Sequence, residues 1–112
     1  MRRYRLSDLE FDGPHIFAKI VDGSRLYKAG VSFHRPSHIS HDDERPHLEV
    51  DQEIFCLLQG SGWIEVDGIR EPARAGDVFV VEPGEDHHLI SSEDDPFVNL
   101  WLHADGPHRQ HM

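Results

Sequence analysis

Two imidazoles and a carboxylate stand where two segments of the chain could bring them to one point. His47 and Glu53 lie close together in one segment, and His87 follows the turn-forming pair Pro83-Gly84 in another. Imidazole nitrogens and carboxylate oxygens are ligands that divalent transition metals bind in proteins. These residues therefore predict a site for a divalent transition metal, used for metal chemistry or for metal-assisted binding.

Alternation along strands would direct these groups to an inner face. Side chains two residues apart on a strand share a face, so His47 and Glu49 point the same way, as do Glu53, Phe55 and Leu57. A buried carboxylate or imidazole is costly unless it is hydrogen-bonded, paired or bound to a cation. Metal binding is the favoured interpretation, and simple hydrogen bonding between buried His and Glu is the alternative.

Short strands separated by turns are the elements that must position these residues. Apolar segments of four to seven residues lie between glycine, proline and aspartate, with no helical repeat. The predicted strands are Ile16–Val21, Arg25–Phe33, His47–Val50, Glu53–Gln59, Gly62–Val66, Ile69–Ala73, Val78–Glu82, His87–Ile90 and Phe97–His103. The clearest hairpin turn is Asp67-Gly68, which suits type I′ geometry. This pattern predicts an all-β protein folded as a two-sheet sandwich or barrel.

The segment His34–Arg45 carries prolines, serines and charges without alternation. It is predicted to be a loop that crosses the mouth of the barrel and could act as a lid. Because such loops run over the surface, His34, His38 and His41 are expected to be solvated rather than to bind a metal.

Two polar residues beside the predicted ligands are given no part in the site. His88 follows His87 directly, so it should face the other way, toward solvent or a partner subunit. Asp51 lies in a connecting turn and is expected to be solvated.

The last predicted strand divides into two faces. Val98, Leu100 and Leu102 form an ordinary packing face, whereas the other face is amphipathic and consists of Phe97, Asn99, Trp101 and His103. The amphipathic face is expected to line a cavity, where Asn99 and Trp101 would touch a small ligand.

The strand that carries Glu53 is apolar on both faces, because Ile54, Cys56 and Leu58 alternate with Glu53 and its inward neighbours. A second subunit is one way to cover the outer face, so a homodimer is predicted. Cys56 itself is expected to be a small buried hydrophobe rather than a catalytic thiol.

Composition bounds the function class. The 112 residues suit one domain, taken as 1–112 with a barrel core at roughly 25–104. The formal charge of -10 repels phosphate backbones and anionic membranes, so a small molecule is the expected partner, with no nucleic acid and no membrane. A single cysteine, no apolar run near ~18 residues and no signal-peptide pattern predict a cytoplasmic protein.

At this point the sequence resembles the cupin superfamily, which implies a jelly-roll, or double-stranded β-helix, barrel. His47, Glu53 and Gly60 fall on its first motif, and the stretch from Gly76 through Pro83-Gly84 to His87 falls on its second. The spacing between the motifs is similar to that of small bacterial cupins. The resemblance implies a bound iron, manganese, nickel, copper or zinc ion and a small polar substrate or ligand.

Four positions depart from the superfamily motifs. Glu49 replaces the second His, Glu82 the first Pro, Ser91 the closing Asn, and His41 the leading Gly. The implied metal ligands are therefore His47, Glu49, Glu53 and His87, or a three-ligand set in which Glu49 is a catalytic base beside the metal.

The ligand pattern also resembles 3-hydroxyanthranilate dioxygenases, whose substrate-holding arginines are replaced here by Asp43 and Ser91. Dioxygenase, isomerase and decarboxylase chemistry remain open on this resemblance. The alternative function is a non-catalytic cupin that binds or senses a sugar or acid, and a bare barrel without metal is the third.

Overall fold

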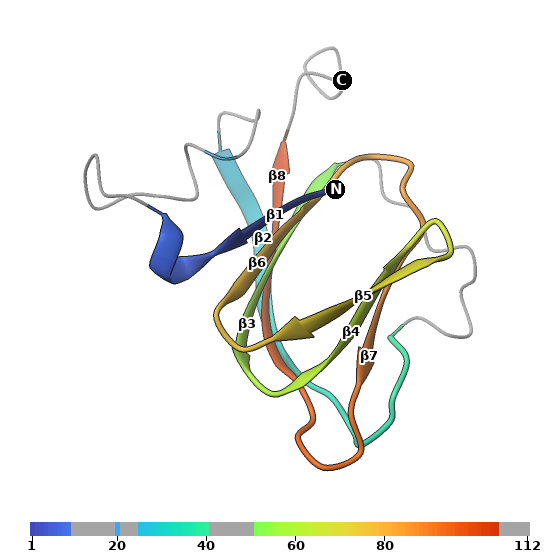
Figure 1. Ribbon diagram of the computed structural model, residues 1–112. Helices are drawn as coiled ribbons and strands as arrows, with labels where there is room; N and C mark the ends of the chain where they lie inside the picture. Colours follow the sequence, from blue (N-terminus) through green and yellow to red (C-terminus); the bar gives the residue numbers. More distant parts are fainter. Residues whose placement is uncertain (10–19, 21–24, 41–50, 106–112) are drawn as a thin grey trace.

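A computed structural model describes residues 1–9, 20, 25–40 and 51–105 of the chain. Its elements are β1 (Arg2–Arg5), the short 3-10 helix η1 (Leu6–Asp8), β2 (Arg25–Phe33), β3 (Gln52–Gln59), β4 (Ser61–Val66), β5 (Ile69–Arg74), β6 (Asp77–Val81), β7 (His87–Ser91) and β8 (Val98–Asp105). They form two antiparallel sheets, one in the order β1-β6-β3-β8-β2 and one in the order β5-β4-β7. The two sheets face each other as layers (Figure 1), which confirms the predicted all-β jelly-roll architecture.

The predicted strands agree closely with the observed ones wherever the structure describes them. β2 has the predicted bounds, and β3 to β8 differ from their predicted bounds by one or two residues at an end. The predicted strand His47–Val50 lies outside the described residues, as does Ile16–Val21 except for Ile20. The Asp67-Gly68 turn between β4 and β5 has φ values of 49° and 82°, and two consecutive positive φ angles are what a type I′ turn requires.

Strand β1 was not predicted, because three of its four residues are arginines and it shows no apolar alternation. It becomes a strand by pairing with β6, with Arg2 opposite Val80 and Arg5 opposite Asp77. Two of its arginines form ion pairs with the buried Asp77 carboxylate. Its strand conformation thus comes from a long-range partner.

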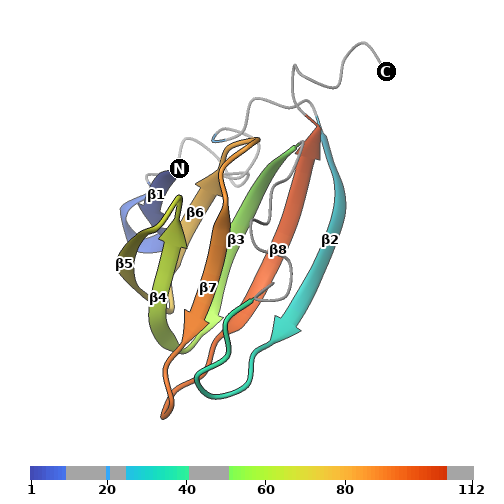
Figure 2. The ribbon, with the colours of Figure 1, turned by 90° about the vertical axis from the view of Figure 1, so that its right-hand side faces the viewer.

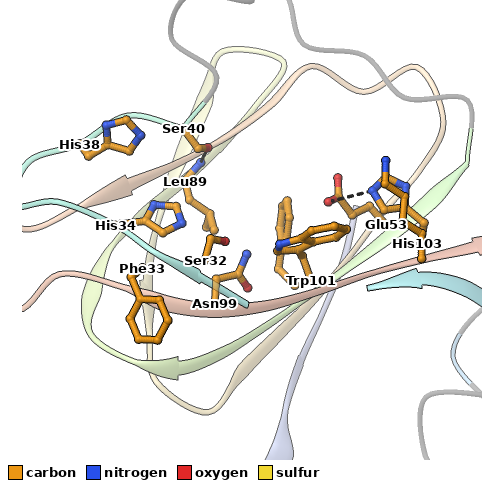
Figure 3. Close-up of a pocket in the computed structure, with 12 residues that line it drawn as sticks. Ser32, Phe33, His34, His38, Ser40, Glu53, Leu89, Asn99, Trp101 and His103 are labelled. Atoms are coloured by element: carbon orange, nitrogen blue, oxygen red, sulfur yellow. Dashed lines mark hydrogen bonds and ion pairs between the residues drawn. The ribbon is translucent and has the colours of Figure 1, made fainter. Parts of the chain in front are cut away.

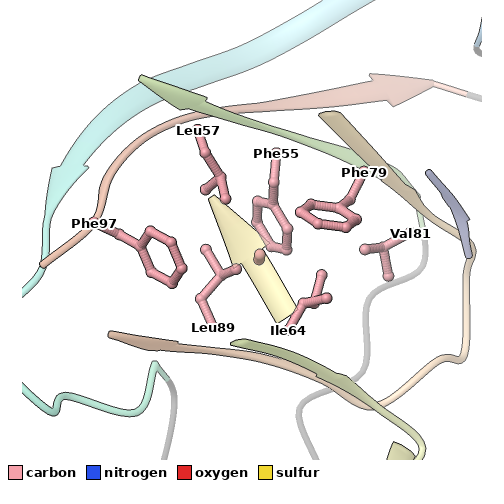
Figure 4. Packing of buried hydrophobic residues seen from close by; sticks show 8 residues of the cluster. Phe55, Leu57, Ile64, Phe79, Val81, Leu89 and Phe97 are labelled. Atoms are coloured by element: carbon pink, nitrogen blue, oxygen red, sulfur yellow. The ribbon is translucent and has the colours of Figure 1, made fainter. Parts of the chain in front are cut away.

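The inner core fills the space between the two sheets. Figure 4 shows side chains from both layers meeting there. Its buried members are Phe55, Leu57, Ile64, Ala73, Phe79, Val81, Leu89 and Phe97. β3 and β6 contribute alternate residues from one sheet, and β4, β5 and β7 contribute from the other. The residues of this cluster are all apolar, and polar side chains such as Glu53 and Asn99 are buried outside it.

A second core covers the outer face of the larger sheet. Its buried members are Ile20, Ile54, Cys56, Val78 and Val80, with Tyr4, Leu6, Leu9, Leu100 and Leu102 packed against them. Cys56 is buried as predicted, and burial raises the pKa of its thiol. The chain therefore covers Ile54 and Cys56 with its own residues, and only Leu58 of the three is substantially exposed, at 47%. The homodimer, predicted from this apolar face, stays a prediction and no longer has Ile54 and Cys56 as its reason.

No helix in the described ranges is long and apolar enough to cross a membrane.

Candidate metal centre

The strand register places three polar residues in one row across the larger sheet. Glu53 on β3 is paired with Val81 on β6 and with His103 on β8, and His103 is paired with Lys28 on β2. Figure 2 shows β3, β8 and β2 lying side by side. Because directly paired residues share a face, Glu53, His103 and Lys28 all belong to the inner face.

The Glu53 carboxylate is hydrogen-bonded to two imidazoles. Its Oε1 lies 3.0 Å from Nε2 of His87. Its Oε2 lies 3.3 Å from Nε2 of His103, the contact drawn in Figure 3. All three side chains are buried. Burial on its own would raise the pKa of Glu53, but the hydrogen bonds and charges of His103 and His87 outweigh it and lower the pKa to about 2. The carboxylate is therefore ionised at neutral pH.

The other ring nitrogen of His87 is fixed by the backbone. Nδ1 of His87 lies 3.0 Å from the carbonyl oxygen of Glu85, which can only accept, so Nδ1 carries the proton. Nε2 then faces the ionised Glu53 either with a second proton or with its lone pair. A proton or a metal cation must lie between these two groups, and a His whose far nitrogen donates to a carbonyl is the usual form of a metal ligand.

The turn before β7 explains how His87 reaches this position. Gly84 has a φ of 83°, and the Glu85 carboxylate accepts a hydrogen bond of 2.6 Å from the backbone N–H of Glu82. This hydrogen bond joins the two ends of the turn. His87 begins β7 immediately after it, with its ring 5.6 Å from that of Phe55 in a tilted arrangement.

The structure thus brings together two of the four predicted ligands, Glu53 and His87. The other two, His47 and Glu49, lie outside the described residues. Within the described ranges, no group of three or more His, Cys, Asp or Glu side chains is arranged to hold a metal ion. The donor chemistry of Glu53 and His87 fits a transition metal, and further ligands would have to come from elsewhere in the chain.

The contact between His103 and Glu53 is not predicted from the sequence. The alternation of β8 correctly placed His103 on the cavity face with Asn99 and Trp101. The pairing of β8 with β3, which sets His103 opposite Glu53, is a long-range register. Alternation along β8 therefore predicts the face on which His103 lies, but it does not predict which residue His103 contacts.

A cavity of about 400 Å³ opens beside this cluster. Its lining combines aromatic side chains with polar groups from the larger sheet and from the segment after β2, and these side chains are drawn in Figure 3. The lining residues are Lys28, Ser32, Phe33, His34, His38, Ser40, Glu53, Phe55, Leu89, Asn99, Trp101 and His103. The prediction that Asn99 and Trp101 line a cavity is confirmed.

Trp101 forms one wall of the cavity by lying over β2. A Cβ added at Gly30 would come within 2.4 Å of the indole ring. Gly30 is paired with Trp101 across the two strands, so the absent side chain leaves the space that the ring occupies. Any larger residue at position 30 would displace the ring toward the cavity.

The loop after β2 lies at the cavity as predicted, but its histidines differ from one another. His38 is exposed, whereas His34 is half-buried and its ring lies edge-on to Phe97 at 6.2 Å. Both line the cavity, so the expectation that they are simply solvated holds only for His38. His41 lies outside the described residues. The loop is attached to β7, because the N–H of Ser91 donates to the carbonyl of His38 at 2.9 Å.

Two predictions about neighbouring polar residues are wrong. His88 does not face solvent or a partner: it is fully buried, with Nδ1 2.7 Å from the Ser40 carbonyl and Nε2 2.8 Å from Asp86. Alternation places His88 on the face of β7 opposite to that of His87, and the segment after β2 covers this face through Ser40. Asp51 is 2% exposed rather than solvated, and it accepts a hydrogen bond from the Tyr27 hydroxyl.

Comparison with known proteins identifies the family. The cupin domain model matches residues 41–103, more than half of the chain, so this protein belongs to the cupin family. Over 146 aligned residues the chain is 26% identical to an acireductone dioxygenase of Phaeosphaeria nodorum, covering 96% of this chain and 83% of that protein.

Solved structures show the same fold. A cupin 2 conserved barrel domain protein from Salinispora arenicola superimposes with a TM-score of 0.62 at 22% identity, covering 98% of this chain and 80% of the other. A cupin protein from Bacteroides fragilis gives a TM-score of 0.59 at 19% identity, covering 70% of this chain and 65% of the other. These likenesses establish the barrel architecture.

Proposed function

We propose that this chain is a metal-dependent cupin enzyme that acts on a small polar molecule, with Glu53 and His87 among the metal ligands. One observation carries the proposal: an ionised, buried carboxylate faces Nε2 of His87, whose Nδ1 is committed to the Glu85 carbonyl. A cation between the two groups would satisfy both. When bound, the metal would supply an open coordination position that polarises a substrate or binds O₂.

The remaining ligands are proposed from the sequence. His47 and Glu49 complete the shell, or Glu49 stays outside it and moves a proton. The metal is iron, manganese, nickel, copper or zinc, because a shell of imidazoles and carboxylates accepts each of them. His103 is proposed as a positioning residue, since it binds Oε2 of Glu53 and thereby orients Oε1 toward His87.

Dioxygenase chemistry is the reaction class to test first. The similarity to the Phaeosphaeria protein, named as an acireductone dioxygenase, favours it over isomerase or decarboxylase chemistry. The cavity beside Glu53 offers room for a small substrate next to the proposed ligands.

A second candidate function is non-catalytic binding of a small sugar or acid without a metal. It is supported by the fact that Glu53 already interacts with both imidazoles. In this case His87 would carry two protons, and the pair would be held by hydrogen bonds alone.

Elemental analysis of the full chain, purified without an affinity tag or chelator, tests the first candidate. We expect near-stoichiometric transition metal in the wild type and its loss in His87→Gln. His88→Gln is the matched control, because His88 is the adjacent residue, is equally buried and faces away from Glu53. Circular dichroism should show all three proteins folded. If iron is found, O₂ consumption with small organic acids follows.

The second candidate is favoured if the wild type contains no metal and takes up none of the five ions on reconstitution. Equal metal content in His87→Gln and the wild type would contradict the assignment of His87 as a ligand.

Assembly and location are proposals from the sequence alone. We expect a cytoplasmic homodimer, and light scattering at micromolar concentration measures the mass. A monomeric mass would contradict the dimer.

A further inference from the structure

The cavity has a second polar end, away from Glu53. Along β8 and β2, three inward pairs follow one another: His103 with Lys28, Trp101 with Gly30, and Asn99 with Ser32. At ~3.4 Å per residue, the four-residue step from His103 to Asn99 spans about 14 Å of strand. Figure 3 shows Trp101 between Asn99 and Glu53, so the lining extends along these strands from Glu53 past the indole to Asn99.

Asn99 presents an unsatisfied acceptor at this second end. Asn99 is 2% exposed, and among the described residues its Oδ1 has no hydrogen-bond partner. A buried acceptor without a donor costs free energy that a hydrogen bond from a ligand would recover. Because Asn99 lines the cavity, its oxygen marks the place where a ligand donates an N–H or O–H.

The charge of the lining differs from the charge of the chain. The chain carries 21 acidic and 11 basic residues, whereas Glu53 is the single carboxylate among the described lining residues, which also include Lys28 and three histidines. The Lys28 ammonium lies 5.9 Å from the centre of the Trp101 indole, and the described part of the chain offers it no ion pair. An anionic group of a ligand is the partner that this cation fits.

The lining also contains apolar side chains. Trp101 lies between the two polar ends (Figure 3), and Phe55 and Leu89 add further apolar surface. The volume of about 400 Å³ falls low in the range of small-molecule sites, ~300–1,000 Å³. A short, flat molecule with polar groups at opposite ends matches these walls.

We propose that the cavity binds an elongated small organic acid that donates a hydrogen bond from its far end. Its carboxylate lies beside Lys28, its flat body lies along Trp101, and its hydroxyl or amino group donates to Oδ1 of Asn99. The inference rests on the proposed function only in identifying this cavity as the substrate site. Recognition of the acid by Lys28 and Asn99 does not require the metal.

Three matched probes test the proposal by calorimetry on the full chain. 4-Hydroxyphenylacetate carries both groups, phenylacetate lacks the hydroxyl, and 4-hydroxyphenylacetamide lacks the charge. We expect the wild type to bind 4-hydroxyphenylacetate about fivefold more tightly than phenylacetate and about threefold more tightly than the amide. Each titration is made on chelator-treated and on metal-reconstituted protein.

Two variants assign these preferences to residues. Asn99→Leu should bind 4-hydroxyphenylacetate and phenylacetate equally, because it removes the acceptor at similar volume. Lys28→Met should lose the preference for the acid over the amide and keep the preference for the hydroxyl. Lys28 is exposed, so this variant tests the proposal even if Asn99→Leu fails to fold.

The proposal is overturned if the wild type shows no saturable binding of 4-hydroxyphenylacetate at millimolar concentration, or if the hydroxyl preference survives in a folded Asn99→Leu. Failure of the proposed function looks different. A protein that takes up no metal but keeps both preferences would reject the enzyme and retain this ligand class, whereas a metal-loaded protein without them would reject only the ligand class.

Discussion

Glu53 and Asp77 are two buried carboxylates on adjacent strands of the same sheet, yet their partners differ in kind. Asp77 is fully buried, with Oδ1 2.7 Å from Arg5 and Oδ2 3.0 Å from Arg3, and Oδ2 also accepts the backbone N–H of Arg74. Glu53 is bound by the imidazoles of two histidines. One carboxylate is enclosed by permanent cations, and the other by groups that can give up their protons.

Burial and a lowered pKa do not tell these two sites apart. Burial on its own would raise the pKa of Asp77, but the hydrogen bond from Arg5, the N–H of Arg74 and the charge of Arg3 lower it. The same balance lowers the pKa of Glu53. The difference is chemical: guanidinium keeps its proton and offers no lone pair, whereas imidazole offers one. The Glu53 cluster also opens on a cavity, so Glu53 is the functional candidate and Asp77 holds the fold.

The largest effect is expected for metal binding. Glu53→Gln should weaken metal affinity at least about 100-fold, because a neutral amide replaces an anionic ligand. Competition with a chromophoric chelator measures the affinity. Asp77→Asn, if folded, serves as the control and should keep the wild-type value. Equal losses of metal affinity in the two variants would mean that the loss comes from a general disturbance of the fold and not from a missing metal ligand.

For the free energy of unfolding, the larger effect is expected from the Asp77 variant and the smaller one from the Glu53 variant. Asp77→Asn is expected to lower the free energy of unfolding by about 3 kcal/mol, because it removes the charge of a fully buried carboxylate that two partly exposed arginines contact. Urea unfolding monitored by tryptophan fluorescence measures this value. In metal-free protein Glu53→Gln should cost clearly less, since a neutral imidazole can remain beside an amide. A smaller loss for Asp77→Asn than for Glu53→Gln would reverse the assignment.

Acid should expose the contribution of Glu53. Its pKa is about 2 in the folded chain, against an ordinary value of 4.5, so its stabilisation is complete above about pH 4.5 and is lost as the pH falls toward 2. The loss attributable to this group is at most about 3 kcal/mol. Unfolding of metal-free wild type and Glu53→Gln across this pH range measures it. Parallel pH profiles for the two proteins would rule out a native pKa as low as 2.

The smallest effect is expected at His103, which acts through Glu53. His103→Leu removes the donor to Oε2 and should weaken metal affinity about tenfold. His103→Gln restores an N–H donor and should recover most of that loss. An equal loss in both variants would show that the imidazole itself is required, as a ligand would be.

Much of the fold could be predicted because strands and turns have local signals. β2 was predicted to the residue, and the Asp67-Gly68 turn was assigned its type from two residues. β1 was missed because its arginines carry no alternation and are ordered by Asp77, which is remote in sequence. Local patterns therefore sufficed wherever a segment's own side chains set its conformation.

The site was predicted in part, and for the same reason. Alternation oriented Glu53 toward the interior, the turn before β7 positioned His87, and the two meet at 3.0 Å. The burial of His88 and Asp51 was missed, because the groups that cover them come from other parts of the chain. Alternation predicts which way a side chain points and leaves open what meets it there.

The sequence by itself determined the strand and turn positions, the inward faces of β3 and β8, and the cupin resemblance carried by Glu53 and His87. Only the tertiary structure decided that His103 lies opposite Glu53, that Gly30 makes room for Trp101, and that the chain covers Ile54 and Cys56 itself. The reason is physical. Backbone alternation and turn geometry depend on neighbouring residues, whereas register and cover depend on which distant strands pair and pack.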